Sequence, residues 1–169
     1  MTKLYLVRHG ETYDNASQIL QGQIQGELNE TGIAQAEQVR DELAATPLDG
    51  VVASDLWRSI QTARIIAAPH GLEVVTTPLL RERDWGDFTG KYIPDLENVK
   101  DWPDNVESLP HLLQRARQFL EFIRERFPDQ TVAAVGHGIM NKAIQAVYLN
   151  KKMNEVVRMK NAEVRVLDI

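Results

Sequence analysis

The chain has 169 residues, of which 43% are hydrophobic and 25% are charged, and it contains no cysteine. A chain of this length and composition is typical of one globular domain, which excludes a disordered or fibrous protein. The lack of cysteine excludes disulfides, cysteine nucleophiles and thiolate metal sites. With 19 basic and 24 acidic residues the net charge is −5, which argues against a nucleic-acid-binding protein but permits a small anionic ligand held by clustered arginines.

The sequence predicts neither a targeting signal nor a membrane span. Residues 1–8 lack the long apolar core and the small-residue cleavage site of a signal peptide. No apolar run approaches the roughly 18 residues that are needed to span a bilayer. We therefore expect a cytoplasmic protein with no membrane partner.

Short apolar runs alternate with helical periodicity in the first half of the chain. Continuous runs of four or five apolar residues are typical of strands buried on both faces. Apolar residues at spacings of three and four indicate a helix with one buried face. In chain order these patterns predict a strand at 4–7, a loop at 11–30, a helix from Thr31 to before Pro47, a strand at 50–54, a helix at 57–70 and a strand at 72–75.

The second half continues the alternation after a long irregular stretch. Residues 79–107 hold prolines, glycines and many charges, and they predict loops with little regular structure. Ser108 begins the longest apolar stripe, which ends at Pro128, and the charged residues of 115–126 are expected to form its solvated face. The remaining elements are a strand at 131–135, a helix at 139–149 and a strand at 162–169. This order predicts an α/β fold, a three-layer sandwich whose mostly parallel central sheet is covered by helices on both faces.

Polar residues follow three of the predicted strands. Arg8 and His9 follow the first strand, Arg58 lies shortly after the second, and His137 follows the fourth. Because ligands bind at the carboxyl ends of parallel strands, we expect these four side chains to meet at one edge of the sheet. Arginine forks bind phosphoryl oxygens, and a neutral histidine can attack phosphorus while a protonated one neutralises the oxygens. The pattern predicts a phosphate site without a metal, because the arginines supply the positive charge.

The motifs that contain these residues resemble those of the histidine phosphatase superfamily, in its phosphoglycerate-mutase-like branch. The resemblance runs in order from residue 3 to 167 and rests on Arg8-His9-Gly10-Glu11-Thr12 with Asn15, Ser54-Asp55-Leu56 with Arg58, Leu80-Arg81-Glu82 with Gly86 and Gly90, and Gly136-His137-Gly138. One Arg-His-Gly is a weak motif, whereas four ordered motifs at predicted strand ends and loops are specific. The resemblance implies a single catalytic domain over residues 1–169, with short cover loops at 13–30 and 84–107.

The resemblance also implies roles for the site residues. His9 would be phosphorylated during turnover, and Glu82 would protonate the leaving alcohol and then activate water. Asp84 and Asp87 stay open as alternatives to Glu82. The residues that would hold the phosphoryl group are Arg8, Asn15, Gln21, Arg58, His137 and Gly138. No cofactor is implied.

The length of the cover segment favours hydrolysis over transfer. Mutases of this family have a long insertion with paired arginines and paired prolines, whereas only residues 91–107 separate Gly90 from Ser108 here and contain neither pair. A short cover admits water, so we expect a phosphoric monoester hydrolase that acts on a small phosphorylated metabolite. The alternatives are phosphoglycerate-mutase-type transfer, a phosphohistidine protein phosphatase and a non-enzymatic phosphate-binding module. The identity of the metabolite and the oligomeric state, including a homodimer, stay open.

Three aromatic residues and two further histidines are not assigned a chemical role by these motifs. Trp85, Tyr92 and Trp102 are expected either to line a substrate pocket or to cover the core. His70 and His111 are expected to be structural residues at a helix end or on the surface.

Overall fold

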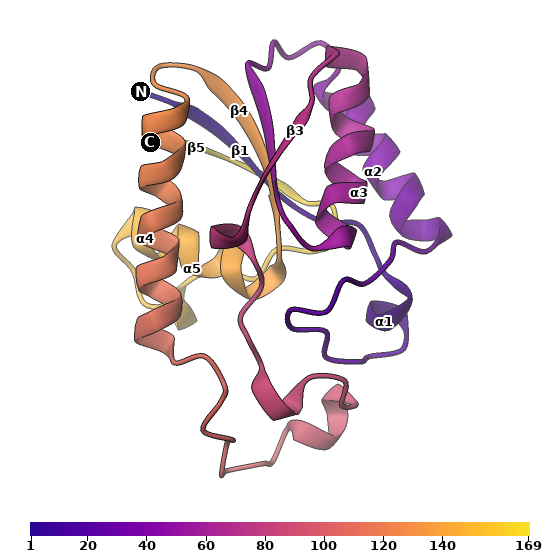
Figure 1. The fold of residues 1–169 in the computed structure, drawn as a ribbon, viewed down its shortest axis with the longest axis vertical. Helices are drawn as coiled ribbons and strands as arrows, with labels where there is room; N and C mark the ends of the chain where they lie inside the picture. Colours follow the sequence, from indigo (N-terminus) through magenta and orange to yellow (C-terminus); the bar gives the residue numbers. More distant parts are fainter.

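Five strands form one sheet in the order β3-β2-β4-β1-β5 in the computed structural model, which describes residues 1–169 (Figure 1). The strands are β1 (Lys3–Arg8), β2 (Gly50–Ser54), β3 (Val74–Thr77), β4 (Thr131–Gly136) and β5 (Val164–Asp168). The first four run parallel, and β5 is antiparallel to β1. The predicted α/β fold with a mostly parallel sheet is confirmed.

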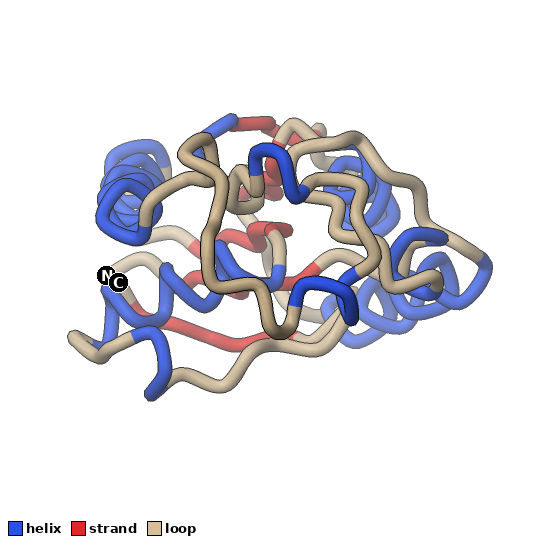
Figure 2. Tube along the Cα trace, turned by 90° about the horizontal axis from the view of Figure 1, so that it is seen from below, coloured by secondary structure: helices blue, strands red, loops and turns tan.

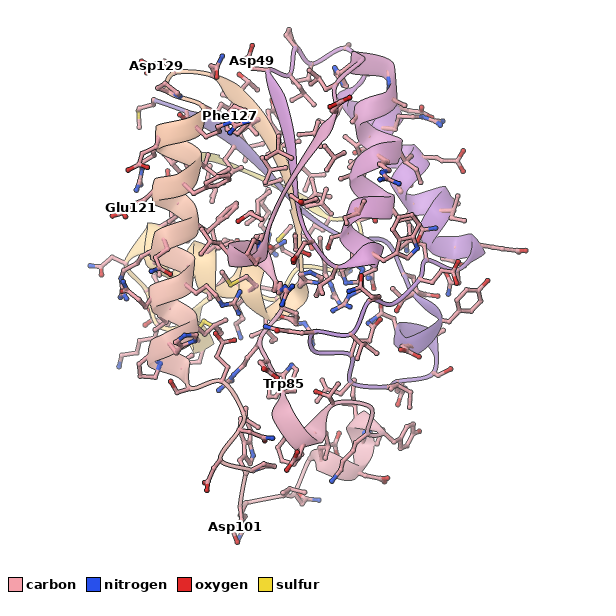
Figure 3. All side chains as sticks on the ribbon, viewed as in Figure 1. Asp49, Trp85, Asp101, Glu121, Phe127 and Asp129 are labelled. Carbon is pink, nitrogen blue, oxygen red and sulfur yellow. The ribbon has the colours of Figure 1, made fainter.

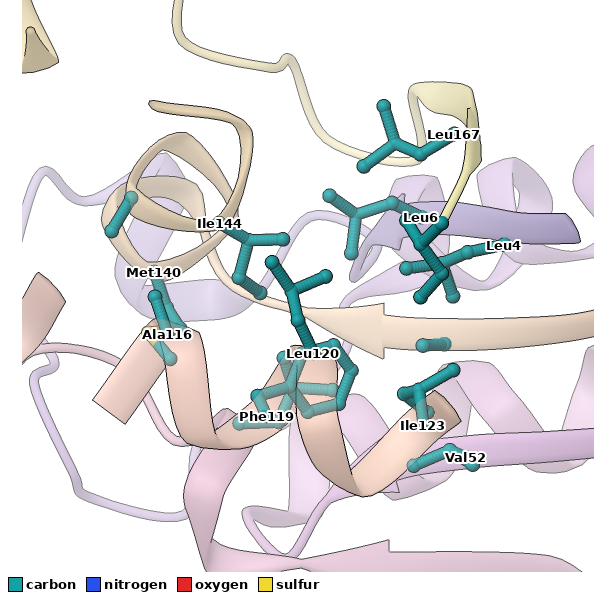
Figure 4. Close-up of a cluster of buried hydrophobic side chains, with 14 of the residues drawn as sticks. Leu4, Leu6, Val52, Ala116, Phe119, Leu120, Ile123, Met140, Ile144 and Leu167 are labelled. Atoms are coloured by element: carbon teal, nitrogen blue, oxygen red, sulfur yellow. The ribbon is translucent and has the colours of Figure 1, made fainter. Parts of the chain in front are cut away.

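Two pairs of helices cover the two faces of the sheet. Figure 1 shows α2 (Glu30–Leu43) and α3 (Trp57–Ala67) on one side, and α4 (Leu109–Arg126) and α5 (Gly138–Leu149) on the other. The larger core lies under α4 and α5, where Phe119 and Leu120 of α4 pack with Leu4 and Leu6 of β1 (Figure 4). Each of these fully buried side chains contributes about 1.5 to 3 kcal/mol of transfer free energy. None of the helices is long and apolar enough to cross a membrane.

Loops and short helical turns lie across the carboxyl ends of the parallel strands, as the view from below shows (Figure 2). The stretch predicted as a loop at 11–30 contains a one-turn helix, α1 (Tyr13–Ala16), in which Thr12 and Asn15 cap each other's backbone. The irregular stretch after β3 forms only 3₁₀ turns, at Pro78–Leu80, Gly86–Phe88 and Ile93–Leu96. These segments build the cover over the edge where the site was predicted.

Several element boundaries differ by one to three residues from the sequence prediction, among them those of the last strand, predicted at 162–169 and found at Val164–Asp168. The strand predicted at 72–75 is found at Val74–Thr77, because parallel pairing with β2 sets Val74 opposite Val51. The helix predicted to end near His70 ends as an α-helix at Ala67 and continues as a 3₁₀ turn. Pro69 accounts for that change, since it has no N–H to donate along the helix.

Candidate active site

The register of β1 and β4 brings the two predicted histidines together. Arg8 pairs with Gly136 across the two strands, and His9 donates its backbone N–H to the Gly136 carbonyl at 3.1 Å. His9 and His137 are therefore the next residues along neighbouring parallel strands. Their ring centroids lie 5.2 Å apart in an edge-to-face arrangement.

His9 is held as a neutral imidazole with one free ring nitrogen. Its side chain is only 2% exposed, and its Nδ1 lies 2.6 Å from the Gly10 carbonyl oxygen. Because a carbonyl only accepts, Nδ1 carries the proton, and the lone pair of Nε2 is free. Burial, followed by the charges of Arg58 and Arg8, holds the pKa of His9 well below 6.5. The ring is thus neutral at neutral pH, as a nucleophile requires.

His137 lies behind His9 and makes different contacts. Its Nε2 is 2.6 Å from the Ser54 hydroxyl and 3.1 Å from the Ser59 hydroxyl, while its buried Nδ1 has no partner. Burial, followed by the charges of Arg58 and by His9, holds the pKa of His137 well below 6.5. The second histidine is therefore neutral in the free protein, because desolvation and the nearby cations both disfavour its protonated form.

Two serine hydroxyls bond to one side of the His137 ring. The Ser54 hydroxyl also accepts from the Leu56 backbone N–H at 3.3 Å, and its second lone pair and its own hydrogen are both able to bond to Nε2 of His137. Nδ1 of His137 is buried and has no hydrogen-bond partner. A buried polar group costs about 1 to 3 kcal/mol when it is left unpaired. When Nδ1 carries the proton, an oxygen of a bound anion would pair with it.

The two arginines keep their charge without any carboxylate partner. Arg58 is fully buried and donates through Nη2 to the Gly22 carbonyl at 2.7 Å and through Nη1 to the Ile24 carbonyl. Arg8 donates through Nη1 to the Met159 carbonyl at 2.8 Å, and the Nε atoms of both arginines have no partner. Burial lowers both pKa values to about 10. The buried Arg58 and the partly buried Arg8 bond only to neutral carbonyls, so their positive charge is available to an anion.

Glu82 lies at the N-terminus of α5, on the wall of the same cavity. Its carboxylate accepts from the backbone N–H groups of Ile139 at 3.1 Å, Met140 at 2.9 Å and Arg83 at 2.8 Å. The alternatives Asp84 and Asp87 do not line the cavity. Both are exposed, and they bond to neighbouring loop residues instead. Of the three acidic residues considered, Glu82 is the one placed among the histidines and arginines.

Asn15 and Gln21 present free amide groups to the cavity. The Asn15 Oδ1 accepts from the Thr12 backbone N–H at 3.1 Å and from Asn161 at 3.3 Å. The Gln21 Oε1 accepts from the Thr12 hydroxyl at 3.0 Å. With each amide oxygen engaged, each NH₂ group is left to donate into the cavity. Gly138 does not line the cavity, because the side chain of Arg158 lies over it.

The cavity has a volume of about 320 Å³. Its lining combines charged and amide groups with eight apolar residues, which include Trp85, Phe88 and Trp102. The Trp102 ring lies edge-on to Trp85 and Phe88, each at 5.7 Å between centroids. Figure 3 shows Trp85 below the sheet, near the start of the segment that extends to Asp101. Trp85 and Trp102 thus line the pocket, whereas Tyr92 does not.

Arg158 also lines the cavity, although no sequence pattern singled it out. It makes no hydrogen bond or ion pair to the protein, and after burial its charge is the largest influence lowering the pKa of Arg8. A Cβ on Gly138 would lie 2.6 Å from its Nε atom, so the glycine lets the guanidinium rest on the start of α5. No motif contains Arg158, and only the folding of residues 156–161 against Arg8 brings it to the site.

The geometry agrees with the comparison with known proteins. A family model described as the histidine phosphatase superfamily, branch 1, matches residues 4–169. The chain belongs to this superfamily. It is 35% identical over 152 residues to phosphoglycerate mutase-like protein 4 of Arabidopsis thaliana, covering 80% of this chain and 66% of that one. It is 37% identical over 142 residues to an uncharacterised phosphatase, PhoE, of Bacillus subtilis, covering 82% and 72%.

Solved structures of superfamily members share the fold over nearly the whole chain. One is a mycobacterial glucosyl-3-phosphoglycerate phosphatase in complex with VO₃, with a TM-score of 0.89 and 28% identity, covering 98% of this chain and 92% of that one. The predicted family is therefore confirmed, and phosphatases are among its structural neighbours. No group of three or more histidine, aspartate or glutamate side chains in the structure is arranged to hold a metal ion.

Proposed function

We propose that this chain is a metal-independent phosphatase that hydrolyses small phosphate monoesters through a phosphohistidine on His9. The observation that carries the proposal is the free Nε2 lone pair of a neutral His9 beside two arginines, the buried Arg58 and the partly buried Arg8, that have no anionic partner. The complex of a similar phosphatase with VO₃ supports it, because oxovanadium anions mimic a phosphoryl group.

The proposed first step transfers the phosphoryl group to His9. Arg8 and Arg58 bind the phosphoryl oxygens, and the Nδ1–H of His137 donates to one of them. Nε2 of His9 attacks phosphorus, the bond from phosphorus to the ester oxygen breaks, and protonated Glu82 gives its proton to the departing alkoxide. The Nδ1 bond to Gly10 keeps the ring aligned and stabilises the phosphohistidine.

The second step returns the enzyme to its starting state. Glu82, now ionised, takes a proton from water as the water oxygen attacks phosphorus. The bond from phosphorus to Nε2 breaks, and inorganic phosphate leaves with Glu82 protonated again. Charge on the phosphoryl oxygens stays paired with the arginines throughout, which is the electrostatic contribution a metal makes in other phosphotransferases.

The thin cover favours water over a second organic acceptor. Residues 91–107 form only the 3₁₀ turn at Ile93–Leu96, and the Trp102 side chain is 49% exposed. A mutase must keep water away from its phosphorylated intermediate while the substrate reorients. The eight apolar residues of the lining are available to contact the organic part of the ester, which favours a small phosphate monoester with apolar surface.

A phosphate-release assay over a panel of phosphate monoesters tests the proposal. We expect release that persists in chelator and falls at least about 1,000-fold in His9→Ala, with acid-labile phosphate trapped on His9 after a rapid quench. Undiminished release by His9→Ala would contradict the proposed mechanism. Conversion of 3-phosphoglycerate to 2-phosphoglycerate faster than its hydrolysis would favour a mutase, and turnover of phosphohistidine peptides alone would favour a protein phosphatase.

A further inference from the structure

A buried ion pair lies behind the loop that contains Glu82. Glu107 and Arg115 have side chains that are 5% and 11% exposed, and Nη2 of Arg115 donates to Oε1 of Glu107 at 2.8 Å. Nε of Arg115 donates to the other carboxylate oxygen at 3.0 Å, so the pair is bidentate. Neither residue lines the cavity. The expectation that the charged residues of 115–126 form a solvated face is therefore wrong for Arg115.

The pair holds the loop on both sides of Glu82. Arg115 donates to the carbonyl oxygens of Leu79 at 3.0 Å, Arg81 at 2.6 Å and Glu82 at 3.3 Å. Glu107 accepts from the Asp84 backbone N–H at 3.0 Å through its side chain. One guanidinium and one carboxylate thus bind the backbone before, at and after the residue assigned as the proton donor.

No regular secondary structure performs this task. After the turn at Pro78–Leu80 the chain forms neither helix nor strand until the turn at Gly86–Phe88. The Glu82 carbonyl also accepts from the Gln23 side chain at 3.1 Å, whereas the carbonyls of Leu79 and Arg81 have Arg115 as their side-chain donor. Leaving such partly buried carbonyls unpaired would cost free energy for each group. Charge-assisted hydrogen bonds are among the strongest in proteins. The pair is therefore able to hold the irregular loop in one conformation and to keep the Glu82 carboxyl group in the position that proton transfer requires.

We propose that Glu107 and Arg115 are positioning residues that hold Glu82 at the ester oxygen of the substrate. The proposal rests on the proposed function, in which Glu82 protonates the leaving group. Glu107 and Arg115 act in one step only, the departure of the alcohol. Binding of the phosphoryl group depends on residues of other elements and is left unchanged.

The dependence of kcat/KM on the leaving group tests this role. The parameter reports phosphorylation of His9, and p-nitrophenolate leaves without a proton whereas an alkoxide needs one. For Arg115→Ala we expect at least an about 10-fold loss with an alkyl phosphate and less than about 3-fold with p-nitrophenyl phosphate. Glu107→Gln shows the same pattern, and Arg115→Lys recovers part of the loss. Arg117→Ala, an exposed arginine on the same helix, shows neither loss.

Glu82→Gln separates this proposal from the proposed function. We expect Glu82→Gln to show the same selective loss, and we expect adding Arg115→Ala to it to cause no further selective loss. Equal losses on both substrates in Arg115→Ala and Glu107→Gln, or no loss in either, would overturn the positioning role while Glu82→Gln stays selective. If Glu82→Gln itself shows no selective loss of kcat/KM with the alkyl phosphate, the assignment of Glu82 as proton donor fails, and this proposal fails with it. Arg115→Lys and Glu107→Gln provide the test should Arg115→Ala not fold.

Discussion

The protonation state of His9 follows from where its two ring nitrogens lie. One nitrogen faces a backbone carbonyl, which fixes the tautomer, and two arginines nearby oppose any second proton. The same cations that attract a phosphate therefore keep the nucleophile neutral. The charges of the two arginines therefore favour both the binding of a phosphate group and the neutral form of His9 that attacks it.

Imidazole nitrogen NMR on the phosphate-free protein measures this state directly. We expect His9 to keep its neutral Nδ1–H form at pH 6.5 and to gain a second proton only well below that value, because burial lowers its pKa. A fully formed imidazolium on His9 at pH 6.5 would contradict the structure. His9→Ala identifies its signal.

Arg158 is expected to strengthen the binding of anions. It lines the cavity, lies beside Arg8 and the start of α5, and has no acidic partner. Arg158→Ala should weaken competitive inhibition by inorganic phosphate about tenfold, which matches the loss of one charge-assisted hydrogen bond. The melting temperature should stay level or rise, since a repulsion is removed. Arg117→Ala is the matched control. An unchanged inhibition constant for inorganic phosphate in Arg158→Ala would show that Arg158 does not contribute to anion binding.

At the level of elements, the loop after β1 and the start of α2 touch through two glycines. A Cβ on Gly10 would lie 2.4 Å from the Gly32 carbonyl oxygen, and a Cβ on Gly32 would lie 1.9 Å from that of Glu11. No L side chain fits between these backbones. The contact fixes the path of the chain directly after His9.

Gly32→Ala tests the importance of this contact. The added methyl group must push the two backbones apart, so we expect a loss of about 1 to 3 kcal/mol in the free energy of unfolding and a fall in kcat as His9 moves. Ile33→Ala, at the neighbouring and partly exposed position, should change both values little. Urea unfolding and phosphate release measure the two effects. An unaffected Gly32→Ala protein would show that the loop tolerates the displacement.

At the level of the whole molecule, the fold buries two histidines in the neutral form. Their pKa values are held well below 6.5 in the folded state, so below pH 6.5 the unfolded chain binds protons that the folded chain does not. Stability contributed by these groups is complete above pH 6.5 and is lost as the pH falls below it. The molecule as a whole is negative, with a net charge of −5, yet its site is locally positive.

Urea unfolding at pH 7.5 and pH 5.5 measures this linkage. We expect the midpoint to fall at the lower pH in the unmodified protein. The fall should be smaller in the double variant His9→Gln and His137→Gln, which has no imidazole to titrate at these positions. An equal fall in both proteins would assign the pH dependence to other groups.

The sequence by itself determined the elements whose signal is local. The apolar runs of β1, β2 and β4 and the long stripe of α4 were predicted within two residues, because burial of a strand or a helix face is visible in its own residue pattern. The positions of Arg8, His9 and His137 at strand ends followed from the same runs. Their convergence needed one added rule, that parallel strands end at one edge of a sheet.

Only the tertiary structure decided the features that depend on segments far apart in the chain. The start of β3 follows from pairing with β2, and Arg158 reaches the cavity because residues 156–161 fold against Arg8. The Arg115 side chain lies against the loop around Glu82 and donates hydrogen bonds to its carbonyl oxygens. Its position in a run of charged residues predicted instead that it would be exposed to solvent. The neutral state of His137 likewise follows from desolvation and from nearby cations. Burial, strand pairing and the electrostatic effect of nearby charges each depend on all the residues that surround a position in the folded protein. Those residues come from distant parts of the chain, so no local residue pattern encodes these effects.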